Sequence, residues 1–327
     1  MRFTIRKIRK INQESCELSE ECDYFNDNVT GKIMINKLSK QTEYLVFWIA
    51  MDIIYILAIW IVLDIQLLPV HIFFIAHIFG IIVATLVMFT GIGAGVLWLP
   101  LLTFSGIPPS EAISLSIFTQ IAGKGIGTIN YIRDGVANLR VIRHFLPYSF
   151  IGITIGFMAS CLLSLKSERL LLYVFVGVAF YLLIQMLQSL YTDHRNYCLQ
   201  LEERAMKKSR LIVICSSFFT GLLSIGNSDW LIPHMKQKLR MSTPESVATG
   251  IVIMFFSVVF YLMLTIACVF LGLNEWPEHS PILFSTCSGV MMGGQIGTRL
   301  TRFEWLRKTQ QHAFIILLAL SIIHLLW

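Results

Sequence analysis

The sequence predicts an all-α polytopic membrane protein with two inverted repeats, each opening with an interrupted re-entrant helix element, and one extra N-terminal span. Hydrophobic residues make up 55% of the 327 residues and charged residues 14%, with a mean hydropathy of +0.69. This composition is too apolar for a soluble domain, and several apolar runs reach the roughly 20 residues needed to cross a bilayer. Two of these runs are interrupted by glycine and proline at corresponding places.

The first interruption reads F-T-G-I-G-A-G-V-L-W-L-P from Phe89 to Pro100. The second reads F-T-G-L-L-S-I-G-N-S-D-W-L-I-P from Phe219 to Pro233. Each glycine costs a helix interior about 1 kcal/mol and each proline about 3 kcal/mol. In a membrane, a broken helix is tolerated where the freed backbone lines a cavity enclosed by protein, and paired breaks indicate a transporter's binding site.

The chain divides into five segments: a charged tail (1–43), an extra span with its loop (44–70), repeat A (71–191), a polar linker (192–210) and repeat B (211–327). After the first interrupted element we expect spans near 110–132, 145–165 and 170–191. After the second we expect spans near 244–271, 282–298 and 313–327. Asp52 lies mid-way along the extra span, either as a transport residue or as a buried partner of a base or hydroxyl.

Matches in the same order along both halves indicate a duplication. The F-T-G triplets correspond, and so do Pro100 and Pro233. Gly152-x3-Gly156-x3-Ser160 corresponds to Gly293-x3-Gly297-x3-Thr301. Such small-xxx-small ridges favour close helix packing in membranes.

The distribution of lysine and arginine predicts the topology, because cytoplasmic loops are enriched in them. They gather in 1–43, 133–144, 192–210, 234–243 and 299–312, and are missing from 64–70, 105–109 and 272–281. With the basic segments inside, each interrupted element must return to the face it entered from, and the two repeats have opposite orientation. The N-terminus is then cytoplasmic and the C-terminus extracellular. The net charge of +6 is spread between apolar runs, so we do not expect nucleic-acid binding.

A polar stripe lies on the span after the first break, where Ser116, Gln120, Lys124 and Thr128 are each four residues apart and share one helix face. A lysine at mid-membrane costs about 2.5–3.5 kcal/mol and normally marks a pathway or a buried ion pair. Two interpretations stay open: Lys124 contacts an anion, or it pairs with Asp52, Asp64 or Asp229.

The N-termini of half-helices expose N–H groups and the positive end of the dipole. Two of them beside Lys124 would form a dry anion site, with no metal and no cofactor. Besides the stripe residues Ser116, Gln120 and Lys124, the candidate binding residues are Gly91, Gly93, Ala94, Gly95, Gly226, Asn227 and Ser228. Asp229 either carries a coupling proton or caps a half-helix, and Arg299 is a candidate gate on the cytoplasmic face.

With these motifs the chain resembles the sulfite exporter TauE/SafE family, also described as sulfonate-uptake-type permeases. The resemblance covers about 79–327 and rests on the first break, on S-E-A-I-S-L-S-I-F-T-Q after it and on G-G-Q-I-G-T-R-L in repeat B. The family's first break is often a run of consecutive glycines, whereas here it is G-I-G-A-G. The resemblance implies a permease for sulfite or organosulfonates, often an exporter, in the bacterial inner membrane.

Two alternatives use the same fold: an anion channel, and a membrane sensor or scaffold whose tail is a docking segment. Proton coupling and a homodimer also stay open. An intramembrane enzyme is disfavoured because the sequence has no H-E-x-x-H motif, no paired aspartates on adjacent spans and no Ser/His pair in register.

Overall fold

The computed structural model describes residues 46–47, 49–51, 53–57, 70–90, 94–191, 203–278, 281–300, 315–316, 318–323 and 325. These residues form helices and the turns between them, with no strand in the described part of the chain. The chain separates into two units, Met1–Ile54 and Tyr55–Trp327, and the second contains all the elements discussed below.

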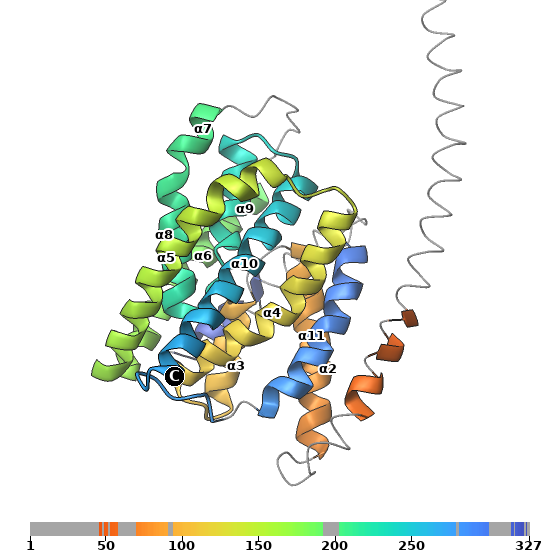
Figure 1. The fold of residues 1–327 in the computed structure, drawn as a ribbon, viewed down its shortest axis with the longest axis vertical. Helices are drawn as coiled ribbons and strands as arrows, with labels where there is room; N and C mark the ends of the chain where they lie inside the picture. The colour runs from red at the N-terminus through yellow and green to blue at the C-terminus, as the bar shows by residue number, and fades with distance from the viewer. Residues whose placement is uncertain are drawn as a thin grey trace, which may run out of the picture. The chain divides into compact units, whose positions relative to one another are not determined.

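Repeat A contains α2 (Val70–Thr90), α3 (Gly95–Phe104), α4 (Pro109–Arg133), α5 (Leu139–Lys166) and α6 (Glu168–Tyr191). The short α7 (Glu203–Lys208) precedes repeat B, which contains α8 (Arg210–Leu223), α9 (Ser228–Lys238), α10 (Thr243–Phe270) and α11 (Pro281–Leu300). Both interrupted elements are therefore broken where the glycines predict (Figure 1).

Two boundaries differ from the prediction. Helix α5 begins at Leu139 rather than near residue 145, because the Asn138 side chain accepts hydrogen bonds from the backbone N–H groups of Arg140 (3.2 Å) and Val141 (3.3 Å). The predicted linker 192–210 also contains α7, a run of good helix formers. The matching starts of α4 and α10 are as expected, since each has a proline at its first or second position and a glutamate in its first turn.

Three described helices are long and apolar enough to cross a membrane, over Leu139–Leu163, Glu168–Gln185 and Thr243–Phe270. Helices α4 and α11 have 25 and 20 residues but carry buried polar side chains, which make them less apolar. Helices α3, α8 and α9 have 10, 14 and 11 residues, fewer than the roughly 20 that a span needs. These features indicate a multi-pass membrane protein, while the count of seven full spans stays a prediction.

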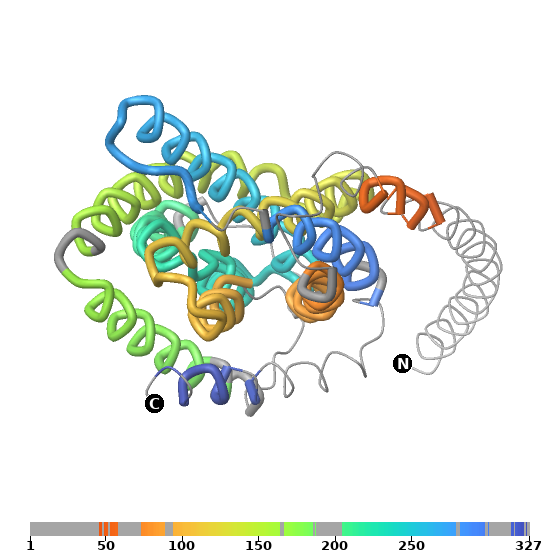
Figure 2. The backbone as a smooth tube through the Cα atoms, turned by 90° about the horizontal axis from the view of Figure 1, so that it is seen from below, coloured from red at the N-terminus to blue at the C-terminus, as the bar shows by residue number. Residues whose placement is uncertain are grey.

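The closest helix pairs join the two halves of the chain. Helix α2 lies along α11, and α5 lies along α8 (Figures 1 and 2). A Cβ at Gly156 would lie 2.1 Å from the Phe218 carbonyl oxygen, and one at Gly293 would lie 2.3 Å from the Ile81 carbonyl oxygen. The predicted close packing of the small-xxx-small ridges is confirmed at these glycines. Between the two pairs, α4 and α10 pack against each other.

In both interrupted elements, the helix after the break contacts the segment before it. In the second element, His234 Nε2 on α9 lies 2.7 Å from the hydroxyl of Ser209, the residue before α8. In the first, the Phe79 ring on α2 lies 5.7 Å from the Trp98 ring on α3. Helix α9 thus returns toward the end from which α8 starts (Figure 1).

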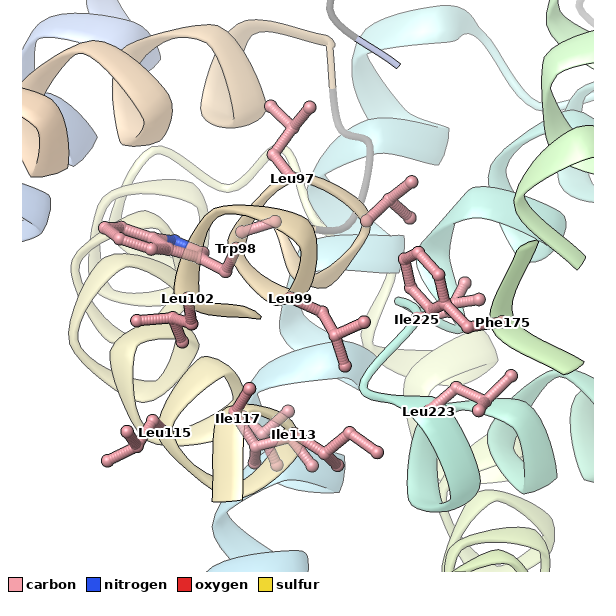
Figure 3. Close-up of a cluster of buried hydrophobic side chains, with 14 of the residues drawn as sticks. Leu97, Trp98, Leu99, Leu102, Ile113, Leu115, Ile117, Phe175, Leu223 and Ile225 are labelled. Atoms are coloured by element: carbon pink, nitrogen blue, oxygen red, sulfur yellow. The ribbon is translucent and has the colours of Figure 1, made fainter. Parts of the chain in front are cut away.

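The hydrophobic core surrounds α3 and the second break. Figure 3 shows side chains of α3 packed between α4, the α6 residue Phe175 and the break residues Leu223 and Ile225. Trp98, Leu99 and Ile225 are all at most 2% exposed. This dry packing fixes the ends of the two half-helices relative to each other.

Candidate functional site

The two helix breaks meet at Gly95 and Ser224. A Cβ at Gly95 would lie 1.7 Å from the Ser224 carbonyl oxygen, so only glycine fits there. Ser224 ends α8 in the left-handed conformation, with φ of 62°. Few residues other than glycine and asparagine adopt this conformation, so Ser224 needs outside contacts to hold it.

Helix α4 supplies those contacts from its polar stripe. Ser116 Oγ lies 2.8 Å from Ser224 Oγ. The Gln120 side-chain amide donates to the Ser224 carbonyl oxygen (3.2 Å) and to its hydroxyl (3.0 Å). The stripe that the sequence singles out is therefore bonded directly to the second break, and the first break lies against the same residue.

Lys124 continues the stripe and is 1% exposed. The charged group that interacts with it electrostatically is Asp229, the second residue of α9, which is 9% exposed. Of the three aspartates considered as its partners, Asp52 and Asp64 lie outside the described residues. A buried ion pair is costly to desolvate, and removing one member leaves an uncompensated charge. Lys124 of α4 and Asp229 of α9 therefore lie close enough to interact electrostatically, and we call the two residues the charged centre.

A cavity of about 10 Å³ lies beside this centre. Lys124, Gln120 and Thr119 of α4 line it, together with Ala94 and Trp98 of the first break. Ala94 is the N-cap of α3, and its carbonyl accepts hydrogen bonds from the N–H groups of Leu97 (3.0 Å) and Trp98 (2.9 Å). The positive end of α3 and the lysine thus border one space, which is as large as about one water molecule.

Asn227, the N-cap of α9, is the centre of a second polar cluster. Its side-chain amide donates to the hydroxyls of Ser149 (3.2 Å), Ser217 (3.2 Å) and Ser257 (3.1 Å). Ser149 Oγ lies 2.8 Å from Ser217 Oγ and 2.6 Å from Ser257 Oγ. All four side chains are 0% exposed. We call these four residues the Asn227 cluster; it joins the second break to α5, α8 and α10.

Several buried polar atoms on α4 and at the second break have no hydrogen-bond partner among the described residues: Gln120 Oε1, Thr128 Oγ1, Asn227 Oδ1 and Ser228 Oγ. Unsatisfied buried polar groups are rare in proteins, and each calls for an explanation. Polar atoms of this kind on α4 and at the second break suit a site that binds a polar ligand.

A family model described as Sulfite exporter TauE/SafE matches residues 76–325, a range that includes both breaks, the stripe and Asp229. The chain belongs to the sulfite exporter TauE/SafE family. The resemblance inferred from the sequence is thereby confirmed, and TauE/SafE membership indicates a membrane transporter of sulfur anions rather than an enzyme. No significant match to the chain was found among curated proteins or among solved structures.

Most of the residues predicted for the anion site are buried at or beside the breaks: Ala94, Gly95, Ser116, Gln120, Lys124, Gly226, Asn227, Ser228 and Asp229. Gly91 and Gly93 lie outside the described residues. Arg299 is on α11, but its side chain is also outside the described part. In the described ranges no three His, Cys, Asp or Glu side chains are placed to hold a metal ion. The roles of these residues stay predictions.

Four serines of this TauE/SafE chain were missed by the sequence analysis: Ser149, Ser217, Ser224 and Ser257. Ser149 and Ser257 are single small polar residues in apolar runs, Ser217 follows another serine, and Ser224 is part of the second break. No spacing pattern connects the four residues. One usable signal was Asn227 itself, because a buried helix-breaking amide must find several partners in the neighbouring helices.

Proposed function

We propose that this protein is a secondary transporter that exports a small sulfur oxyanion, sulfite or an organosulfonate, by alternating access at the two helix breaks. One observation carries the proposal: Lys124 is buried on the helix face that bonds to the second break and borders the first. The proposal places the protein in the bacterial inner membrane with its N-terminus in the cytoplasm.

The chemistry of the site suits one anion at a time. Lys124 supplies a full positive charge, and the N-terminus of α3 supplies a partial one. Asp229 already interacts with Lys124, so an entering anion competes with this carboxylate. If Asp229 takes up a proton as the anion binds, the site keeps its net charge, and transport is then coupled to protons.

The two halves of the site differ in a way that favours the α3 side for binding. By the repeat matches, the Asn227 cluster corresponds in repeat order to small or apolar residues: Asn227 to Ala94, Ser217 to Val87, Ser257 to Gly123 and Ser149 to Val290. All four counterparts line the cavity beside Lys124. The space that an amide and three hydroxyls fill in one half is therefore lined by apolar side chains and glycine in the other, and the anion binds there when the helices part.

The helix pairing supports alternating access of inverted repeats with re-entrant elements. Exchanging the two halves of the chain turns the pair α2 and α11 into the pair α8 and α5, and both pairs are present. Exchanging the halves also swaps α4 with α10, so the contact between these two helices is its own counterpart. Transporters built from inverted repeats move largely by rocking such groups of helices around a fixed central site.

The test is anion flux in proteoliposomes holding the purified full-length protein, with sulfite, an alkylsulfonate, sulfate and chloride compared. The variant is Lys124→Gln, and Lys238→Gln, an exposed lysine at the end of α9, is the matched control. A hydrogen bond to a charged group contributes about 1.5–3 kcal/mol, so we expect subsaturating flux to fall about 10- to 100-fold in Lys124→Gln. The control should keep wild-type flux.

A second comparison tests the coupling. An alkylsulfonate stays ionised across neutral pH, so any pH dependence of its flux belongs to the protein. We expect flux to rise as the pH falls, and Asp229→Asn to remove that dependence. Saturable flux that survives in Lys124→Gln would remove this lysine from the site, and no flux of any sulfur anion from folded protein would overturn the proposed function.

A further inference from the structure

A second basic site lies away from the breaks, where α5 begins beside α7. Six residues line a cleft of about 620 Å³: Leu139, Arg140, Arg143, His144, Met206 and Lys207. None of these described lining residues is a carboxylate. The two arginines are three positions apart on α5 and so share a face, and Lys207 faces the same space from α7.

His144, one of the lining residues, packs against an aromatic ring outside the cleft. The His144 ring lies 5.9 Å from the Tyr148 ring, and the guanidinium of Arg210 lies 5.0 Å above that same ring. His144 Nε2 and Arg210 Nε are both buried and have no hydrogen-bond partner among the described residues. The cleft itself carries three exposed cations: Arg140, Arg143 and Lys207.

The cleft also has an apolar part and lies at one end of a candidate span. Of its lining residues, Leu139 is 59% exposed and Met206 is 5% exposed. The stretch of α5 that is long and apolar enough to cross a membrane starts at Leu139, so the cleft lies at that end of the helix. By the distribution of bases this is the cytoplasmic side, where basic pockets between helices bind lipid headgroups.

We propose that this cleft binds the phosphate headgroup of an anionic phospholipid from the cytoplasmic leaflet. Arg140 and Arg143 hold the phosphate oxygens, Lys207 adds a third charge, and Leu139 lies against the start of the acyl chains. A free oxyanion would satisfy the cations equally well but gains nothing from Leu139 and Met206. The combination of cations with apolar contacts therefore favours the lipid. This inference does not depend on the transported substrate.

The experiment measures lipid retention by native mass spectrometry on the full-length protein, titrated in neutral detergent with phosphatidylglycerol, phosphatidylcholine or inorganic phosphate. The variant is Arg140→Gln with Arg143→Gln. The matched control removes the same charge outside the cleft, with Arg133→Gln and Lys238→Gln. Each base near the headgroups contributes about fivefold in affinity, so we expect phosphatidylglycerol to bind about 30-fold more weakly to the cleft variant. In the control variant, the affinity for phosphatidylglycerol should change less than about threefold. The affinity for phosphatidylcholine should be the same in the cleft variant as in the wild type.

Four results would overturn the inference. Equal losses in the variant and the control would mean diffuse surface charge rather than a site. Inorganic phosphate competing at the same concentration as the lipid would mean that the cleft takes free oxyanions. Binding that appears only after deletion of residues 1–43 would mean that the acidic part of the tail occupies the cleft. Circular dichroism shows whether the cleft variant is folded. If it is not, Lys207→Gln alone decides, because we expect it to weaken phosphatidylglycerol binding about fivefold. Unchanged binding in Lys207→Gln is the fourth result that would overturn the inference.

Discussion

Replacing Asn227 by alanine tests whether its side chain holds the second break in place. The substitution removes three hydrogen bonds of 3.1–3.2 Å, to Ser149, Ser217 and Ser257. The amide has two N–H hydrogens for these three contacts, and each buried hydrogen bond contributes about 0.5–1.5 kcal/mol, so the amide group contributes about 1–3 kcal/mol. The serines keep their bonds to one another, so they are not left unsatisfied. We therefore expect a loss of about 2 kcal/mol.

The assay is equilibrium unfolding in mixed micelles with increasing SDS, followed by circular dichroism, for the wild type and Asn227→Ala. The control is Ser105→Ala, which removes one exposed hydroxyl bond of 3.1 Å to the Leu101 carbonyl and should cost about 0.5 kcal/mol or less. A loss for Asn227→Ala no larger than that of the control would refute the view that the Asn227 cluster stabilises the break.

Three further expectations follow from packing and topology. Gly156→Ala places a Cβ 2.1 Å from the Phe218 carbonyl oxygen and should cost at least about 1–3 kcal/mol in the same unfolding assay. Gly177→Ala on α6, where nothing lies within 4 Å, should instead stabilise by up to about 1 kcal/mol, and equal losses at both positions would contradict the packing argument. Gly95→Ala pushes the Ser224 carbonyl away and should reduce proteoliposome flux to background with helix content preserved; normal flux would mean that the breaks need not touch. A C-terminal tag should react with an impermeant reagent on whole cells, and a cytoplasmic tag would reject the re-entrant topology.

The sequence was most informative where a residue type has one dominant physical effect, such as breaking a helix or placing a charge in an apolar run. Glycine and proline inside an apolar run located both breaks, and the structure ends α2 and α8 within a few residues of them. Lys124 needed no pattern, since a lysine in the middle of an apolar helix must be paired or functional. The stripe on α4 followed from helical spacing alone, and two of its members bond to Ser224.

The remaining contacts depend on tertiary packing, which the sequence does not encode locally. Ser149, Ser217 and Ser257 come from three helices and converge only because α5 lies along α8 and packs on α10. The sequence also left open which aspartate interacts with Lys124, because separation along the chain does not tell which half-helix packs near α4. The early start of α5 was a local feature that was overlooked, since asparagine before a helical run is a common N-cap.

The tightest helix pairs each join one helix of repeat A to one helix of repeat B, which limits how the chain can be assembled. Among the described helices, α2 packs against the glycines of α11, and α8 packs against those of α5. Neither half of the polypeptide can complete its tightest helix contacts by itself, so a chain cut within 192–202 should yield fragments that fold only when expressed together. By the same reasoning, a single-repeat ancestor would have needed a second, oppositely inserted copy of itself to bury the same glycines.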